Sequence, residues 1–210
     1  MFITFEGING SGKSTQAKLL FNFLKKQGKD VVLTKEPGGG GEFCTKLRRI
    51  ICETDDISKL TETFLLFAAR KEHLDKLIIP SLKDGKIVIC DRYIDSTFAY
   101  QCNNDPDKIK FVELLHEKIG GLMPDKTFYI DISVSESNYR LAEKIYESTM
   151  NAMSERSGYK KYDHLADESM QKILDSYRKI AENNKQRIIT INGTRTAEEI
   201  HKQIVKELGF

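Results

Sequence analysis

The stretch FEGINGSGKST, residues 5–15, decides how the rest of the chain is interpreted. Within it, residues 7–14 fit the pattern G-x-x-x-x-G-K-[ST], in which a glycine-rich loop curls successive backbone N–H groups around a phosphate. Glycine permits this curl because it adopts positive φ angles, and a helix that begins at the end of the loop adds the positive end of its dipole. The nucleotide-binding residues predicted from this loop are Gly7, Asn9, Gly10, Ser11, Gly12, Lys13, Ser14 and Thr15.

The two flanks of the loop support this prediction. Residues 1–5 form an apolar run, and residues 14–26 carry apolar side chains at helical spacing before Gly28 ends the pattern. Strand, loop and helix therefore follow in the order that a phosphate-binding loop needs, which leaves a flexible glycine turn as the weaker alternative. We expect Lys13 to reach the outer phosphates of a nucleoside triphosphate and the Ser14 hydroxyl to bind Mg²⁺.

The composition limits the class of protein. With 210 residues, of which 40% are hydrophobic and 30% charged, the chain is long enough for one sizeable core, and we expect one domain over residues 1–210. The 33 basic and 31 acidic residues nearly cancel, so we expect no nucleic-acid polymer as a partner. We see no signal peptide and no apolar run of bilayer length, and therefore expect a cytoplasmic protein without a membrane partner. The spacing of the four cysteines and four histidines predicts neither a zinc site nor a disulfide framework.

Short apolar runs alternate with amphipathic stretches along the chain. Four further runs are continuously apolar, as strands covered on both faces should be, and they occupy residues 31–33, 87–90, 127–130 and 187–191. The amphipathic stretches cover residues 42–52, 61–82, 107–119, 134–146, 167–183 and 196–208. This alternation predicts an α/β fold with a parallel sheet, and functional residues should gather at the carboxyl ends of its strands.

Two of the predicted strand ends carry informative residues. Residues 34–41 read TKEPGGGG, which favours a close approach of backbone to another group, although a surface turn is the plain alternative. Glu36 should face the crevice there. Residues 91–93 read DRY, in which Asp91 fits the acid that organises Mg²⁺ and Arg92 suits a bidentate clamp on phosphate. For Asp91 and Arg92, the plain alternative is an ion pair that caps the strand.

Several sequence blocks, taken in order, resemble bacterial thymidylate kinases. They are the loop at 7–14, EPGG at 36–39, LR at 47–48, LFAAR at 66–70, DRY at 91–93 and STFAYQ at 96–101. The resemblance covers essentially the whole chain. It implies transfer of the ATP γ-phosphoryl group to dTMP, giving dTDP, by a three-layer P-loop kinase fold with a five-stranded parallel sheet and a mobile lid, usually as a homodimer. The residues alone leave open another nucleoside monophosphate kinase, or a nucleotide-dependent switch or ATPase.

The resemblance also implies roles for individual residues. It gives substrate contacts to Glu36, Pro37, Arg48, Phe67, Arg70, Arg92, Ser96, Tyr100 and Gln101, and a contact with adenine to Arg140. It gives Lys13, Asp91 and Arg92 catalytic roles, with Ser14 and Asp91 near the metal. In this resemblance Arg48 and Arg92 hold the acceptor phosphate.

The base and sugar of the acceptor have their own predicted contacts. Phe67 resembles the ring that stacks on thymine, while Arg70 and Gln101 resemble the residues that read the edge of the base. Tyr100 resembles the ring that crowds the 2′ position of the sugar. Phe67 has a plain alternative as a core residue of a helix, and Arg140, like Arg48, could be an exposed helix charge.

The chain departs from the family pattern in two places. Lys35 stands where an arginine is common and Gly40-Gly41 where a threonine is usual, which weakens the predicted acceptor contacts near them. The segment of residues 146–163, expected to form the lid, lacks the familiar Asp-Arg-aromatic-Glu run. Its Ser, Asn and Gly content suits a mobile loop that closes over ATP.

The lid is also expected to supply a catalytic cation. The third position of the phosphate-binding loop is Asn9 rather than an arginine, so charge that stabilises the transferring phosphoryl group must come from elsewhere. Arg156, Lys160 and Lys161 are available. Position relative to the following helix favours Lys161, whereas the planar, permanently charged guanidinium favours Arg156. We expect Arg156 to act with assistance from Lys161, and a solvated charge cluster is the alternative.

Overall fold

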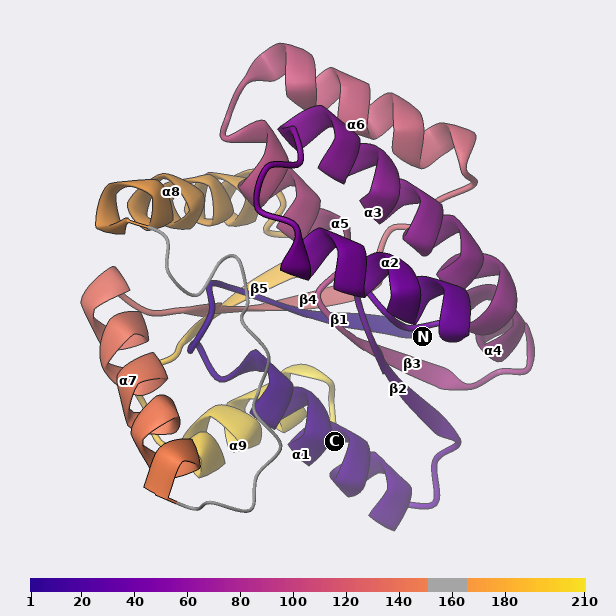
Figure 1. The fold of residues 1–210 in the computed structure, drawn as a ribbon. Coiled ribbons are helices and arrows are strands. Elements are labelled where there is room, and N and C mark those ends of the chain that lie inside the picture. Colours follow the sequence, from indigo (N-terminus) through magenta and orange to yellow (C-terminus); the bar gives the residue numbers. More distant parts are fainter. Residues whose placement is uncertain (151–165) are drawn as a thin grey trace.

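The computed structural model describes residues 1–150 and 166–210 and has an α/β architecture (Figure 1). Its strands are β1 (Phe2–Glu6), β2 (Val31–Lys35), β3 (Ile87–Asp91), β4 (Lys126–Asp131) and β5 (Ile188–Asn192). They form a five-stranded sheet in the order β2-β3-β1-β4-β5, and every neighbouring pair is parallel. The predicted parallel sheet is confirmed, with each strand within about two residues of the apolar run that predicted it.

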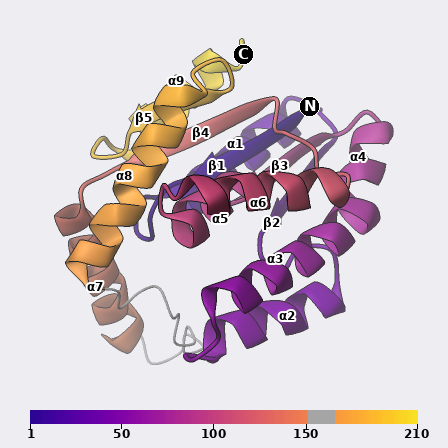
Figure 2. The same ribbon diagram turned by 90° about the horizontal axis from the view of Figure 1, so that it is seen from above.

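Helices lie on both faces of the sheet (Figures 1 and 2). They are α1 (Lys13–Lys26), α2 (Glu42–Glu53), α3 (Lys59–His73), α4 (Ile79–Lys83), α5 (Ile94–Thr97), α6 (Pro106–Lys118), α7 (Val134–Met150), α8 (Asp167–Asn183) and α9 (Ala197–Glu207), with the π-helical segments η1 (Leu74–Ile78) and η2 (Phe98–Cys102). Helices α1 and α9 cover one face, and α3, α6 and α8 lie over the other. The three-layer architecture expected from the sequence is present.

The central strand β1 is buried along its whole length, which is why the sequence reads as an unbroken apolar run. Phe5 packs on Phe128 of β4 with ring centroids 5.5 Å apart, and Leu20 and Leu24 of α1 cover them from the same face. Full burial of each such side chain contributes about 1.5–3 kcal/mol relative to exposure. This packing fixes α1 beneath the sheet and so fixes the loop that joins β1 to α1.

The predicted helix over residues 61–82 is interrupted. The structure divides this stretch into α3, the π-helical segment η1 and α4, with Pro80 in the first turn of α4. Proline lacks the N–H that would bond the carbonyl four residues earlier, and its ring clashes with that carbonyl, so the widened π-turn accommodates it.

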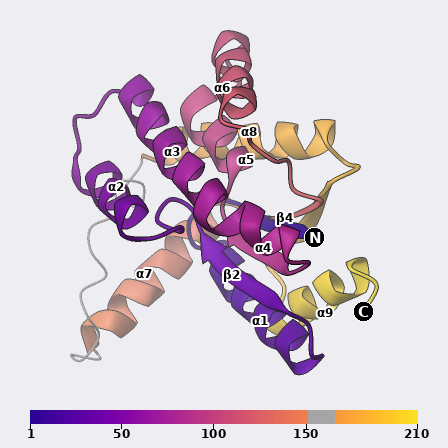
Figure 3. The same ribbon diagram turned by 90° about the vertical axis from the view of Figure 1, so that its right-hand side faces the viewer.

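Helices α2 and α3 pack against each other beside the sheet. In Figures 2 and 3, α2 and α3 lie side by side, away from α7. Residues 94–102, for which periodicity predicted no element, form α5 and η2 directly after β3. Within residues 1–150 and 166–210, no helix combines the length and apolar character needed to cross a membrane.

Candidate active site

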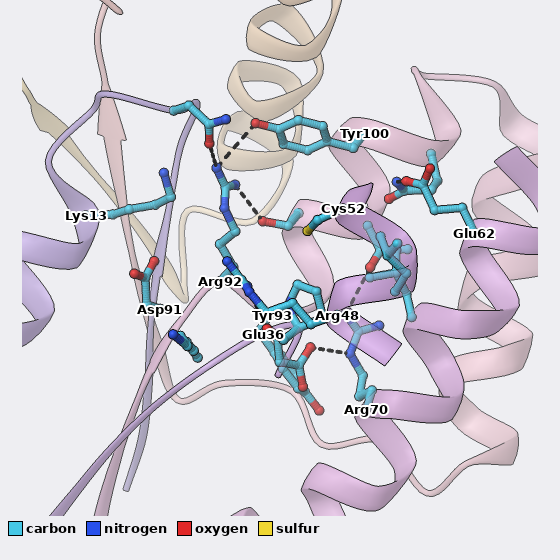
Figure 4. Close-up of a pocket in the computed structure, with 18 of the residues that line it drawn as sticks. Lys13, Glu36, Arg48, Cys52, Glu62, Arg70, Asp91, Arg92, Tyr93 and Tyr100 are labelled. Carbon is cyan, nitrogen blue, oxygen red and sulfur yellow. Dashed lines mark hydrogen bonds and ion pairs between the residues drawn. The ribbon is translucent and has the colours of Figure 1, made fainter. Parts of the chain in front are cut away.

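A cavity of about 280 Å³ lies at the carboxyl ends of β1, β2 and β3 (Figure 4). The predicted site residues that line it are Asn9, Lys13, Ser14, Glu36, Pro37, Arg48, Arg70, Asp91, Arg92, Ser96, Tyr100 and Gln101. They come from the phosphate-binding loop, the ends of β2 and β3, helices α2 and α3, and the segment that follows β3. The fold therefore brings to one cavity residues that the sequence distributes over about a hundred positions.

The loop between β1 and α1 has the conformation that its glycines predict. Gly7, Gly10 and Gly12 have φ angles of 141°, 74° and 96°, where a side chain is disfavoured. At Gly7 a Cβ atom would also lie 2.7 Å from the backbone oxygen of Ile130. Lys13 Nζ donates a hydrogen bond to Ile8 O at 2.9 Å, inside the curl of the loop. The lysine is thus already directed towards the concave side, where a phosphate would lie.

Two oxygen ligands suited to a hard cation meet beside the loop. Ser14 Oγ donates a hydrogen bond to Asp91 Oδ2, so the hydroxyl at the start of α1 and the carboxylate at the end of β3 are in contact. Asp91 Oδ1 is buried and has no hydrogen-bond partner among the described residues. An orphaned carboxylate oxygen next to a serine hydroxyl fits Mg²⁺, which takes oxygen ligands and keeps several waters or phosphate oxygens.

Arg92 lies in the centre of the site (Figure 4). Its φ of 69° is unusual for a residue with a side chain, and it turns the chain directly after β3. Its guanidinium donates to Gly7 O at 3.0 Å and to Asn9 Oδ1 at 2.5 Å, so it is bonded to the phosphate-binding loop. The Arg92 Cζ atom lies 5.2 Å from the ring centroid of Tyr100, whose hydroxyl accepts from Nη2 at 3.3 Å.

A buried acid that the sequence analysis did not select lies behind Arg92. Glu6, the last residue of β1, is 1% exposed and accepts hydrogen bonds from Tyr93 N at 2.7 Å and Ser96 Oγ at 2.6 Å. Burial, and next the carboxylate of Asp95, raise its pKa to about 7. The signal was present in the sequence, because a carboxylate at the end of an otherwise apolar buried strand needs specific partners.

A second buried network positions Arg70, which is 2% exposed. Its Nε donates to Glu36 Oε2 at 2.8 Å and its Nη2 to Thr97 Oγ1 at 2.9 Å, while Nη1 is buried with no partner in the part of the chain that the structure describes. His73 Nδ1 lies 3.0 Å from the other Glu36 oxygen. Burial alone would raise the pKa of Glu36, but Arg70 and then His73 hold it below its ordinary value. Glu36 is thus the counter-charge that fixes Arg70.

The two other residues predicted to contact the base differ in their surroundings. Gln101 Nε2 donates to Glu62 Oε1 at 2.8 Å, and both side chains line the cavity. Phe67 is 3% exposed, packs in the apolar cluster around β3 and lies against Arg70, whose Cζ is 5.0 Å from its ring centroid. Phe67 is not among the residues that line the cavity, so its stacking on thymine stays a prediction.

The remaining predicted arginines lie in different places. Arg48 lines the cavity from α2 and donates to Pro37 O at 2.7 Å, which connects α2 to the segment after β2. Arg140 lies on α7, outside this cavity, where Nε donates to Glu136 Oε1 at 2.6 Å and Nη2 to Gly193 O at 2.8 Å. Its predicted contact with adenine therefore belongs to another part of the molecule than the acceptor residues.

The remaining predictions concern the lid cations, the cysteines and a metal site built from side chains. The predicted lid cations Arg156, Lys160 and Lys161 lie outside the described residues. Cys90 is buried as expected, and Cys52 is a half-buried cysteine that lines the cavity without having been predicted there. In residues 1–150 and 166–210 no group of three or more His, Cys, Asp or Glu side chains is arranged to hold a metal ion.

Comparison with known proteins gives one consistent family. A family model described as Thymidylate kinase matches residues 5–204. A thymidylate kinase of Wolbachia pipientis wMel is 38% identical over 212 residues, which cover 99% of this chain and 100% of that protein. A thymidylate kinase of Pelobacter propionicus is 39% identical over 210 residues, covering 99% of this chain and 93% of that protein.

A solved structure agrees with these relatives. The crystal structure of thymidylate kinase from Ehrlichia chaffeensis matches with a TM-score of 0.74 at 33% sequence identity. The match covers 99% of this chain and 98% of that one, so it includes the sheet, both helical layers and the elements that line the cavity.

Proposed function

The chain belongs to the thymidylate kinase family, and from this premise we propose that the cavity of Figure 4 is the site that holds dTMP beside Mg²⁺ and ATP. As a member of this family the protein transfers a phosphoryl group from ATP to dTMP, which yields dTDP. The observation that carries the assignment of the cavity is the convergence of a phosphate-binding lysine, Lys13, with two arginines, the buried Arg70 and the partly buried Arg92.

The two ends of the cavity suit the two ends of a nucleoside monophosphate. Arg92 lies beside Lys13 and the loop, so its guanidinium, with that of Arg48, would hold the phosphate of the acceptor. Arg70 lies at the other end, and its unpartnered Nη1 donor would meet a carbonyl oxygen of the base. A base that presents an amino group at this place should bind more weakly. The amino group and the Arg70 N–H are both donors, so each would be left without an acceptor.

Positioning and charge neutralisation account for the catalysis that these residues provide. The acceptor is a phosphate monoester whose second pKa is about 6, so it is already a dianion at neutral pH and needs no general base. Asp91 and Ser14 would hold Mg²⁺, which supplies positive charge for the phosphates. The backbone N–H groups of the loop and Lys13 hold the donor phosphates, while Arg92 orients the acceptor oxygen towards them.

We also propose that the segment of residues 146–163 supplies the remaining positive charge, with Arg156 as the main group and Lys161 assisting. The support is chemical, since Asn9 leaves the loop without an arginine at its third position. Arg156→Ala should lower kcat by about 100-fold with little change in KM for dTMP, as expected for a contact made in the transition state. If Lys161→Ala shows this pattern instead, the assignment moves to the lysine.

One coupled assay tests the proposed substrate. Mg²⁺-ATP is offered with dTMP, dUMP, dCMP, dGMP or AMP, and formation of the diphosphate is followed for each. Preference for dTMP and rejection of dCMP are expected from the donor of Arg70. Consumption of ATP without any acceptor would indicate a nucleotide-dependent switch, and preference for AMP would indicate a different monophosphate kinase.

We further propose that the 210 residues form one catalytic domain that acts as a homodimer in the cytoplasm. Among the described residues the four cysteines form no disulfide, which agrees with a reducing compartment. Exposed apolar side chains on α3 and α6 offer a surface for a second copy: Leu60, Phe64 and Leu114 are each about half exposed, and Phe64 contacts Phe111 of α6 edge to face.

A further inference from the structure

Arg92 is held by a partly buried network that reaches two residues not predicted as site residues, Glu6 and Tyr177. Arg92 Nη1 donates to the hydroxyl oxygens of Ser96 and Tyr177, each at 3.1 Å. The same hydroxyls donate to Glu6 Oε2, at 2.6 Å from Ser96 and 3.1 Å from Tyr177. Tyr177 lies on α8, 171 residues from Glu6 in sequence.

The chemistry of the four groups fixes the direction of these bonds. A guanidinium can only donate and an ionised carboxylate can only accept, so the two hydroxyls between them must accept from Arg92 and donate to Glu6. Burial, and next the Glu6 carboxylate, raise the pKa of Tyr177 well above its ordinary value, so this hydroxyl keeps the proton that it donates. Above its pKa of about 7, Glu6 is therefore the counter-charge of Arg92, which it reaches through the two hydroxyls.

Glu6 also fixes the backbone around Arg92. Its Oε1 atom accepts from Tyr93 N at 2.7 Å and from Ser96 N at 3.3 Å. Tyr93 directly follows Arg92, whose φ is 69°. Burial alone would lower the pKa of Arg92, but Tyr100, Tyr177 and the nearby carboxylates raise it above its ordinary value, so the guanidinium stays charged. One carboxylate thus restrains both the main chain and the side chain of the arginine.

Tyr177 holds its hydroxyl in place through its ring. The ring stacks on Tyr129 of β4 with centroids 5.4 Å apart and an interplanar angle of 17°, and Tyr177 is 2% exposed. A phenol fixed in this way has little rotational freedom, so the position of its oxygen is set by the sheet and not by the flexible arginine.

We propose that Glu6 and Tyr177 are positioning residues for the phosphoryl acceptor, which act through the guanidinium of Arg92. The inference rests on the proposed role of the cavity as the dTMP site, and on Arg92 as the group that meets the acceptor phosphate. Neither residue is among those that line the cavity. Their effect is to hold the donors of Arg92 in one orientation before the acceptor arrives, which lowers the cost of ordering the site.

Tyr177→Phe tests the proposal because it removes one hydroxyl and keeps the stacked ring. Loss of a hydrogen bond to a charged group is worth about 1.5–3 kcal/mol, so kcat/KM for dTMP should fall by about 10- to 150-fold. KM for ATP should stay within about twofold. The matched control is Tyr129→Phe, which removes a hydroxyl from the same stack, where it bonds Asp131 instead of Arg92, and should leave both substrates unaffected.

A double-mutant cycle separates positioning from a general loss of structure. In an Arg92→Lys background the guanidinium is gone, so adding Tyr177→Phe should cost less than about twofold in kcat/KM for dTMP. Glu6→Gln, measured in the same two backgrounds with the thermal midpoint of each variant, should repeat the pattern. Full additivity, equal losses for dTMP and ATP, or the same loss in Tyr129→Phe would overturn the proposal. The wild-type rate with dTMP tests the function itself and is independent of these outcomes.

Discussion

Among single residues, Asp91 could act either by organising Mg²⁺ or as a general base. Its carboxylate accepts a hydrogen bond from Ser14 Oγ, and its other oxygen has no hydrogen-bond partner among the described residues. A role in organising Mg²⁺ predicts that Asp91→Asn lowers kcat by about 100-fold or more. It also predicts that the rate at saturating substrates shows no base-like step between pH 7 and 8.5 that depends on Asp91, because the acceptor is already a dianion. The test is to measure kcat against pH for the wild type and for Asp91→Asn. A base-like step that is present in the wild type and absent from the variant would identify Asp91 as a general base.

Tyr100 has two separable contacts, a ring that lines the cavity and a hydroxyl that accepts from Arg92 at 3.3 Å. If the ring denies space to a 2′-hydroxyl, Tyr100→Ala should raise the efficiency with ribothymidine monophosphate relative to dTMP by about 10-fold. Tyr100→Phe is the control, because it keeps the ring, removes the hydroxyl and should leave this ratio unchanged. An unchanged ratio in both variants would make the ring a packing residue.

Among single residues, the sequence predicted those that line the cavity better than those that hold them in place. Twelve predicted site residues line the cavity, because motif positions are adjacent in sequence to the strand ends that carry them. Glu6, His73 and Tyr177 were not selected. Their partners lie on other elements, 37 residues away for His73 and 171 for Tyr177, and no local pattern connects such positions.

Among the elements, strands were predicted closely and helix interruptions were not. A strand buried on both faces is apolar at every position, so its run identifies it. The amphipathic pattern of residues 61–82 continues through η1, because a π-turn shifts the apolar stripe by only one residue, and Pro80 was the available signal. The short elements α5 and η2 depend on contacts with Glu6 and α8, which only the folded chain supplies.

The end of β1 should make stability depend on pH through Glu6. Its pKa of about 7 in the folded protein exceeds the ordinary value of 4.5, so between these values the unfolded chain releases its proton first. The folded state then binds more protons, and the free energy of unfolding falls as pH rises from about 4.5 to about 7, by up to about 3 kcal/mol from this group. Stability from the protonated acid is thus fully present below pH 4.5 and lost above pH 7.

Glu6→Gln measures this contribution. Urea unfolding at fixed protein concentration, from pH 5 to pH 8, should give a difference between wild type and variant that declines with pH, since glutamine does not titrate. Other titrating groups cancel in that difference. Glu168→Gln, an exposed acid on α8, is the control and should give a flat difference. A flat curve for Glu6→Gln as well would mean that Glu6 is ionised throughout this range.

For the whole molecule, the outer faces of α3 and α6 lead to a prediction about assembly. Leu60 and Phe64 on α3 and Leu114 on α6 are 55%, 50% and 49% exposed, and the contact of Phe64 with Phe111 makes the two faces continuous. A two-fold axis through this surface would bury it against its own copy, as in an isologous interface. Arg70 lies on the buried side of α3, so association would also restrain the helix that carries it.

The expected species is a dimer of twice 24.0 kDa by light scattering at micromolar concentration. Phe64→Asp combined with Leu114→Asp places like charges in the apolar surface and should shift the mass to that of a monomer, because an unpaired buried charge costs several kcal/mol. Tyr139→Asp, at a residue of α7 that is 61% exposed, is the control and should leave the mass unchanged. A wild-type monomer at these concentrations, or a dimer that survives the double substitution with its fold intact, would place the contact elsewhere or remove it. If the monomer forms and retains dTMP affinity, α3 holds Arg70 without help from the partner; if affinity falls, assembly contributes to the acceptor site.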